Sequence, residues 1–248
     1  MLDKKADINT ISDSKIIVAL DYADAARAMV LVNQLDPFLC RLKVGKELFT
    51  AAGPQLVEQL IAKNFQVFLD LKFHDIPTTV KKACQAASNL GVWMLNVHAS
   101  GGTNMMQAAL EGVQQSAHQP YLIAVTVLTS MNQANLNETG VTRIIEDQVL
   151  ALAKLTQQAG LHGVVCSALE AQLIKQHLPS DFLLVTPGIR PVSASSGTII
   201  SDDQSRMLTP AQALHMGASY LVIGRPITQA AQPLVALTQI YNEITDLQ

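Results

Sequence analysis

The stretch FQVFLDLKFHDIPTTVKKACQAASNLG, residues 65–91, contains the repeating unit that decides the fold. Its apolar run at 65–72 predicts a strand buried on both faces, because polar and apolar residues do not alternate along it. A helix is expected from about Pro77, since the first helical turn tolerates proline, to Gly91, which can end a helix. The next apolar run, at 92–98, follows directly. This order of elements is a βα unit of a parallel sheet.

The same unit recurs along the chain. Amphipathic stretches alternate with apolar runs, including one from Val141 to Ala159 and a final one from Pro226 to about Asp246. Eight such units without a change in composition predict an α/β fold, namely a single-domain (β/α)8 TIM barrel at 15–248 behind a loose N-terminal arm at 1–14. A doubly wound open sheet is the alternative. The remaining runs that predict strands lie at 16–21, 40–45, 121–128, 163–167, 182–186 and 220–224.

Composition narrows the class of protein. The 248 residues are 49% hydrophobic and 15% charged, which allows a large core and excludes a disordered, collagen-like or coiled-coil chain. The net charge of −3 gives no basic excess for binding nucleic acid or an anionic membrane. The three cysteines are scattered, the first segment is polar, and no apolar run approaches about 20 residues. We therefore expect a cytoplasmic protein without a disulfide framework or a membrane span.

Two connections are longer than a barrel needs, at 129–140 and 187–208. Both leave the carboxyl ends of predicted strands, where barrel enzymes place their chemistry. Loops of this length are usually functional, with a decorative loop as the alternative. The second is rich in Gly, Ser and Thr, so it could close over an anion.

Charged residues gather at the ends of the first three predicted strands, although charge is scarce in this chain. They are Asp21, Lys43, Asp70 and Lys72, with Asp75 three residues further on. Asp70 and Lys72 share one face of a strand, and in a barrel that face is the lumen or its rim. Burial there requires opposite charges to compensate each other, so we predict an alternating network. A structural ion-pair cluster or a solvated loop is the alternative.

This network predicts a type of chemistry. A lysine flanked by carboxylates is held in its ammonium form, which makes it a proton donor rather than a Schiff-base nucleophile. The carboxylates can orient that ammonium and repel negative charge on a ligand, as is needed to protonate a carbanion. At the last strand, Gly224-Arg225-Pro226 offers N–H groups and a guanidinium to a phosphate, although the tripeptide alone could be an ordinary turn.

These residues carry a resemblance to a known family. The segment DLKFHDIP at 70–77 is similar to the signature of the orotidine 5′-phosphate decarboxylase family. One departure is Thr78, where many members have Asn, and it affects none of the implied roles. Further matching motifs, in the family's order, are VALD ending at Asp21, LKVGKELF around Lys43, VLTS around Thr129, TPGIRP around Arg190, DDQSR around Gln204 and VIGRPI around Arg225.

The resemblance implies an activity and its catalytic residues. The activity is decarboxylation of orotidine 5′-monophosphate (OMP) to UMP, the last step of de novo pyrimidine synthesis, with no cofactor and no metal. Lys72 is implied as the acid that protonates pyrimidine C6. Asp70 is implied to lie near the substrate carboxylate, and Lys43 and Asp75 to complete the charged network.

The resemblance also implies how the nucleotide is held. Family members are homodimers, and the residues implied to reach the partner's site are Asp75, Ile76 and Thr79. The implied substrate contacts are Asp21 and Lys43 for the ribose, Thr129 for the ring, Arg190, Gln204, Gly224 and Arg225 for the phosphate, and Pro187 and Asp70 elsewhere on the nucleotide.

Three other functions remain open. A sugar-phosphate decarboxylase or aldolase that needs Mg²⁺ shares the DxKxxD pattern, although HDIP and PGIRP argue against it. A metal-dependent pentose-phosphate epimerase would use His74 and His98 with Asp70, whereas hydrogen-bonded structural histidines are more common. A non-catalytic phosphate-binding barrel would not need the intact set of Asp70, Lys72 and Asp75.

Overall fold

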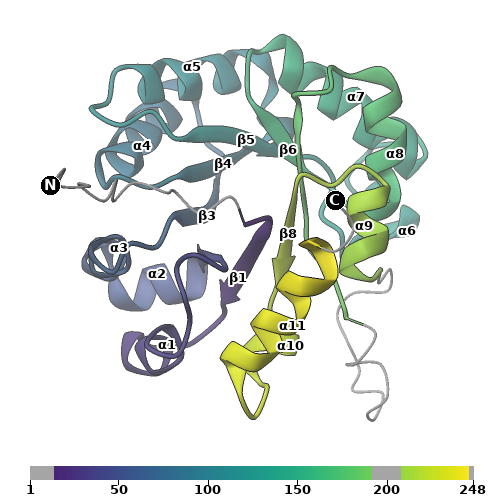
Figure 1. The fold of residues 1–248 in the computed structure, drawn as a ribbon. Coiled ribbons are helices and arrows are strands. Elements are labelled where there is room, and N and C mark those ends of the chain that lie inside the picture. The colour runs from purple at the N-terminus through teal and green to yellow at the C-terminus, as the bar shows by residue number, and fades with distance from the viewer. Residues whose placement is uncertain (1–13, 192–207, 246–248) are drawn as a thin grey trace, which may run out of the picture.

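The computed structural model describes residues 14–191 and 208–245. Within these ranges, eight parallel strands close into one barrel in sequence order, and β8 pairs with β1. Helices surround the barrel on its outside (Figure 1). The predicted single-domain (β/α)8 barrel is confirmed, and the open-sheet alternative is wrong.

The observed strands match the predicted apolar runs to within a few residues at each end. The largest difference is in the run at 121–128, where the strand ends at Val125. The strands are β1 (Ile16–Leu20), β2 (Arg41–Gly45), β3 (Val67–Phe73), β4 (Met94–His98), β5 (Tyr121–Val125), β6 (Gly163–Val165), β7 (Leu183–Thr186) and β8 (Tyr220–Ile223).

The helices follow the strands in the expected alternation, and several begin with a side-chain cap. Asp24, for example, accepts a hydrogen bond from the Arg27 N–H at the start of α1. The helical segments are α1 (Ala25–Val32), α2 (Lys46–Ala52), α3 (Pro54–Ala62), α4 (Pro77–Asn89), the 3-10 turn η1 (Ala99–Gly101), α5 (Gly102–Gln114), α6 (Gln133–Glu138), α7 (Ile145–Gln158), α8 (Ala168–His177), α9 (Pro210–His215), α10 (Arg225–Thr228) and α11 (Pro233–Thr245).

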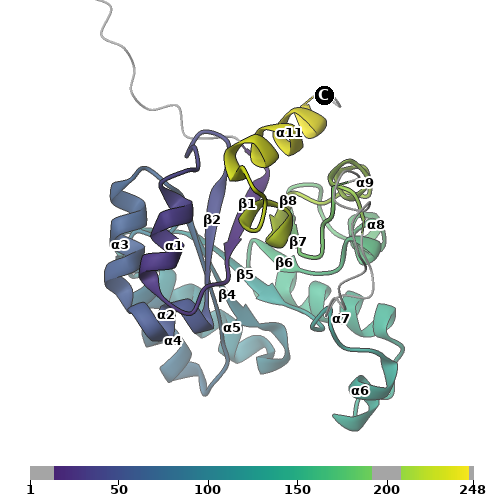
Figure 2. The same cartoon turned by 90° about the horizontal axis from the view of Figure 1, so that it is seen from below.

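Two helix predictions need correction. The helix expected from Val141 begins at Ile145, and the connection before it contains the short helix α6, which Figure 2 shows standing away from the barrel. The Gln133 side chain of α6 accepts a hydrogen bond from the Ile145 N–H at 2.9 Å, which satisfies a donor in the first turn of α7. The final helix is interrupted, because α10 ends at Thr228 and Pro233, which has no N–H to donate, starts α11.

Alternation along the strands divides the core into two layers. In β1, Ile16, Val18 and Leu20 pack outward beneath the helices, while Ile17 and Ala19 point into the barrel. The lumen is therefore filled with side chains and is not a pore. Its buried apolar residues are Ile17, Ala19, Phe68, Met94, Ile123, Val185 and Val222.

The lumen carries cationic side chains from β2 at both of its ends. The Arg41 guanidinium carbon lies 4.4 Å from the ring centre of Trp93 and 5.1 Å from that of Tyr220, so it stacks on aromatic faces at the amino-terminal end. Lys43, two residues later on the same face, lines a pocket at the opposite end. The expected arm at 1–14 falls outside the described residues except for Ser14, whose buried hydroxyl accepts a hydrogen bond from the Ile16 N–H.

Close packing of α4 against α5 gives a stability prediction. A methyl group at Gly112 in α5 would overlap the backbone carbonyl of Lys81 in α4. Within a helix, replacing Gly by Ala ordinarily stabilises a protein by roughly 0.5–1 kcal/mol. We expect Gly112→Ala to do the opposite and lower the free energy of unfolding by about 1–3 kcal/mol, because the helices must move apart.

Urea unfolding measures this effect. Gln114→Ala, at an exposed position of the same helix, is the control and should change the free energy of unfolding by less than about 0.5 kcal/mol. A stabilised Gly112→Ala protein would contradict the close approach of the two helices.

Candidate active site

A pocket of about 290 Å³ opens at the carboxyl-terminal end of the barrel. This volume is near the lower end for small-molecule sites. The pocket combines segments that are far apart in sequence, because the carboxyl ends of all parallel strands meet at one pole. The predicted site residues that line it are Asp21, Lys43, Asp70, Lys72, Thr129, Pro187, Arg190, Gly224 and Arg225.

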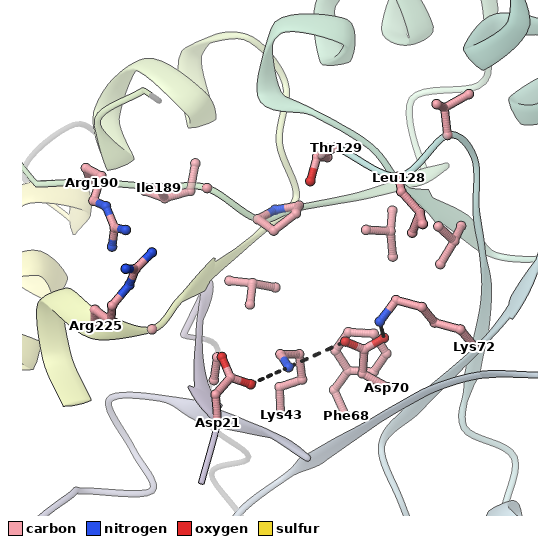
Figure 3. Close-up of a pocket in the computed structure, with 18 residues that line it drawn as sticks. Asp21, Lys43, Phe68, Asp70, Lys72, Leu128, Thr129, Ile189, Arg190 and Arg225 are labelled. Carbon is pink, nitrogen blue, oxygen red and sulfur yellow. Dashed lines mark hydrogen bonds and ion pairs between the residues drawn. The ribbon is translucent and has the colours of Figure 1, made fainter. Parts of the chain in front are cut away.

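Four of these residues form a continuous chain of alternating charges (Figure 3). The Lys43 Nζ lies 3.2 Å from the Asp21 Oδ1 and 3.4 Å from the Asp70 Oδ2. The Lys72 Nζ lies 2.7 Å from the other oxygen of Asp70, and both lysines point into the pocket. The predicted network therefore exists for these four side chains, and its centre is the carboxylate of Asp70.

Burial makes this pairing strong. Only 12% of the Asp70 side chain and 11% of the Lys43 side chain are exposed, whereas Asp21 is 67% exposed at the rim. Burial alone would raise the pKa of the Asp70 carboxyl, but Lys43, Lys72 and the hydrogen bonds from Lys72 and Asn96 hold this pKa below its usual value. Asp70 is thus kept as a carboxylate between two ammonium groups.

Lys72 has an unusual backbone for a strand residue. Its φ is +52°, in the left-handed region that residues other than glycine seldom adopt. The pairing of β3 with β4 shifts register between Leu69 and Phe73, so Asp70, Leu71 and Lys72 form a bulge. The Lys72 N–H donates to the side chain of Asn96 at 2.8 Å. Strand alternation correctly predicted that Asp70 and Lys72 face the lumen, but it did not predict this bulge.

Two arginines lie on the opposite side of the pocket from Lys72. Figure 3 shows the guanidinium groups of Arg190 and Arg225 pointing toward one another. Gly188, at φ +81°, turns the chain after β7, and the Arg190 N–H then donates to the carbonyl of Leu208. Two neighbouring cations in a ligand-sized pocket indicate an anion site.

The remaining predicted residues lie outside this pocket. Asp75 and Ile76, between β3 and α4, and Thr79, in the first turn of α4, are exposed, and the Asp75 carboxylate accepts a hydrogen bond from the Ile76 N–H at 2.6 Å. Within one chain, Asp75 does not join the charge network. Gln204 and most of the connection at 187–208 fall outside the described residues.

The two histidines near β3 and β4 stack against each other. The ring centres of His74 and His98 lie 5.5 Å apart. Burial, followed by the proximity of His74, Lys46 and Lys72, lowers the pKa of His98 to about 4, so this ring is neutral at physiological pH. Among residues 14–191 and 208–245, no group of three or more His, Cys, Asp or Glu side chains is placed to hold a metal ion.

Two residues that support the charge network were not predicted. Asn96 is the only non-apolar residue in the buried part of the run 92–97, and such an isolated amide was a signal that could have been noticed. Gly45 ends β2, and a Cβ there would lie 3.3 Å from the Lys43 Nζ, so glycine leaves room for that ammonium. Nothing in the sequence alone marks Gly45 for this role.

A family model and similar curated proteins point to the same enzyme family. A family model described as "Orotidine 5'-phosphate decarboxylase / HUMPS family" matches residues 14–240. The orotidine 5′-phosphate decarboxylase of Nitrosococcus oceani is 58% identical over 94% of this chain and 99% of its own length. That of Vibrio cholerae is 56% identical over 94% of this chain and 100% of its own.

Solved structures agree. The crystal structure of orotidine 5′-phosphate decarboxylase from Lactobacillus acidophilus has a TM-score of 0.82 and 37% identity to this chain, and the match covers 93% of this chain and 98% of that one. In the described part of the present chain, no helix has the length and apolar character needed to cross a membrane.

The position of Lys43 gives a pH-dependent prediction. Lys43→Met removes the charge that most lowers the pKa of Asp70. A lowered carboxyl pKa stabilises the folded chain above the unfolded value of about 3.9, and this stability is lost as pH falls through the folded pKa. We therefore expect Lys43→Met to lose about 1–3 kcal/mol of stability at pH 7.

Thermal melts between pH 7 and pH 3 measure the effect. The difference from the parent should begin to narrow below about pH 4, where the carboxyl becomes protonated in the unfolded chain, and should narrow further as pH falls through the lowered pKa of Asp70 in the folded parent. Lys154→Met, at an exposed position of α7, is the matched control with no such pH dependence. A stability loss for Lys43→Met that is independent of pH would show that Asp70 is not its source.

Proposed function

The chain belongs to the orotidine 5′-phosphate decarboxylase / HUMPS family, and from that premise we propose that it converts OMP to UMP and CO₂ in pyrimidine biosynthesis. The observation that carries the proposal is the Lys72 ammonium, held 2.7 Å from Asp70 inside a pocket that also contains two arginines. A proton donor and an anion site are thereby placed in one cavity, as this reaction requires. The three buried cysteines are free, which supports a reducing compartment such as the cytoplasm.

The proposed chemical step needs no electron sink. The bond between C6 and the carboxylate breaks, CO₂ leaves, and the electron pair remains on C6 in the plane of the ring. The Lys72 Nζ donates a proton to C6 to give UMP, and the lysine regains a proton from solvent. Because the ring cannot delocalise this electron pair, the rate depends on preorganised charge beside C6 rather than on a cofactor or metal.

Asp70 has two tasks in this mechanism. It accepts a hydrogen bond from the Lys72 ammonium and so aims the proton donor. Its negative charge also faces the substrate carboxylate, and the repulsion between them is relieved when CO₂ departs. Lys43 neutralises the other oxygen of Asp70, which keeps the buried carboxylate ionised.

Binding of the nucleotide uses the rest of the pocket. We assign the phosphate to Arg190, Gly224 and Arg225, which line the pocket, and to Gln204, which lies outside the described residues and is assigned from the resemblance alone. Asp21 and Lys43, at the ends of β1 and β2, are placed for the ribose hydroxyls, and Thr129 and Pro187 for the ring side. Binding energy from the phosphate and ribose, remote from C6, can then be used to close the site around the reacting carbon.

A homodimer completes the proposal. Asp75, Ile76 and Thr79 are exposed beside the strand that carries Lys72, and Ile76 is a large apolar side chain that is 67% exposed. In the dimer, these three residues would extend into the pocket of the partner and supply the acid that is missing from the network of a single chain.

A turnover assay tests both the activity and its proton donor. OMP is added to the purified chain in EDTA, and the change in ultraviolet absorbance is followed. We expect turnover by the parent, and also by Lys154→Ala, which removes an exposed lysine from α7. Lys72→Ala should reduce turnover to background while UMP still binds, because the ammonium is needed for proton transfer to C6.

The outcomes separate the parts of the proposal. No turnover of OMP by the parent, with or without EDTA, would refute the function and leave a Mg²⁺-dependent sugar-phosphate enzyme as the alternative. Turnover of OMP that occurs only when EDTA is left out would refute the metal-independent mechanism. Near-normal turnover by Lys72→Ala would show that another group protonates C6.

Arg225→Ala tests the phosphate site. Removing one charge-assisted contact should cost roughly 1.5–3 kcal/mol, or about 10- to 150-fold in affinity for UMP. The loss should be much smaller for uridine, which has no phosphate. Arg27→Ala, on the exposed face of α1, is the matched control. Calorimetric titration measures all three proteins, and unchanged UMP binding by Arg225→Ala would overturn the assignment.

A further inference from the structure

Asn96 is a polar side chain in the middle of the barrel. It lies in β4 and is completely buried. Met94, two residues before it, belongs to the apolar cluster inside the lumen, so Asn96 faces the lumen as well. A buried amide without hydrogen bonds would be costly, and its partners therefore show why it is there.

The backbone opposite Asn96 is the bulge that carries Lys72. Leu69 pairs with Leu95, and Phe73 pairs with Val97, so three residues of β3 stand opposite Asn96 alone. An extended strand cannot accommodate the two extra residues without distortion, and Lys72 takes up the left-handed conformation. The hydrogen-bond ladder between β3 and β4 is therefore interrupted opposite Asn96.

The carboxamide of Asn96 fills that gap with two hydrogen bonds. Its Oδ1 accepts from the Lys72 N–H at 2.8 Å, and its Nδ2 donates to the Asp70 Oδ1 at 2.7 Å. A backbone N–H can only donate and a carboxylate can only accept, so these partners fix the orientation of the amide. The same Asp70 oxygen accepts from the Lys72 Nζ.

These contacts close a ring that begins and ends at Lys72. The backbone of Lys72 is fixed through Asn96, and its ammonium is fixed through Asp70, whose carboxylate Asn96 also holds. We infer that Asn96 is a positioning residue for the decarboxylation, which sets the Lys72 ammonium and the Asp70 carboxylate at one fixed geometry. The inference rests on the proposed function. Asn96 itself does not line the pocket and acts through its two neighbours.

Removing the amide should affect the chemical step more than binding. With Asn96→Ala or Asn96→Ser, the bulge loses its support, and the ammonium moves from its place beside C6. We expect kcat to fall roughly 100-fold, as a misplacement of about 1 Å can cause, with KM within about threefold of the parent. Thr156→Val is the matched control, because Thr156 is equally buried and hydrogen-bonded but lies on α7. It should retain kcat.

Asn96→Asp supplies a readout that a packing role would not produce. The ionised carboxylate introduced by this substitution cannot donate to Asp70, and two facing carboxylates repel each other. A proton shared by the pair would restore the lost donor, so the activity of Asn96→Asp relative to the parent should rise as pH falls from 8 to 5. The other charged groups near the pair, Lys43 and Lys72, are shared by both proteins, and His98, with a pKa of about 4, stays neutral over this range.

The outcomes are distinct. A folded Asn96→Ala or Asn96→Ser protein with kcat within twofold of the parent would overturn the inference, as would a relative activity of Asn96→Asp that does not change with pH. Crystal structures of the variants test it independently of turnover, because Lys72 should leave its left-handed conformation and its Nζ should move away from Asp70. Variants that keep the parent geometry would also refute it. Failure of the parent to decarboxylate OMP would instead refute the proposed function.

Discussion

The carboxylate of Asp70 is the group on which the site depends. A buried carboxylate with 12% of its side chain exposed is unstable unless cations and donors surround it. Here two ammonium groups and one amide satisfy it, and each partner is thereby fixed in turn. The buried acid organises the two lysines, and the lysines keep the acid ionised.

The barrel makes this arrangement possible. Lys43 and Asp70 come from neighbouring parallel strands. Gly45 is in register with Asp70, so Lys43 lies two residues lower, and its long side chain extends past Gly45 to reach the carboxylate. Below them, apolar side chains such as Phe68 and Met94 fill the lumen and exclude water. A closed ring of strands also resists sideways movement, which suits a site whose charges must be in place before the substrate reacts.

The sequence alone predicts most of the fold and the positions of most charged residues. Continuous apolar runs identify the strands, because a parallel sheet covered on both faces leaves no polar face. Because side chains alternate along a strand, Asp70 and Lys72, two residues apart, are then predicted to face the lumen together. Helix ends were less predictable, since the start of α7 depends on a hydrogen bond that the Ile145 N–H donates to α6, and the break after α10 depends on Pro233.

The parts that sequence reasoning did not reach have a common cause. The bulge at Lys72 arises from the pairing of β3 with β4, which is a contact between strands that no local pattern encodes. The role of Asn96 follows from that bulge, and Gly45 matters only because Lys43 folds over it. The regular alternation of side chains along β3 is broken at Lys72, the residue proposed to donate the proton. Departures from local sequence rules are expected at functional sites.

The balance of charge in the pocket explains why a chain of net charge −3 can bind a nucleotide anion. Among the described lining residues, Lys43 and Lys72 are balanced by Asp21 and Asp70, while Arg190 and Arg225 add positive charge at the other side. In the proposed reaction, the phosphate of OMP neutralises that arginine pair. The substrate carboxylate is then the one negative charge without a matching cation among these groups. CO₂ leaves as a neutral molecule, so this negative charge passes to C6, and it is removed only when Lys72 donates a proton and regains one from solvent. The charges of these groups therefore match bound UMP rather than bound OMP, and the Lys72 ammonium lies beside the carbon on which the negative charge develops.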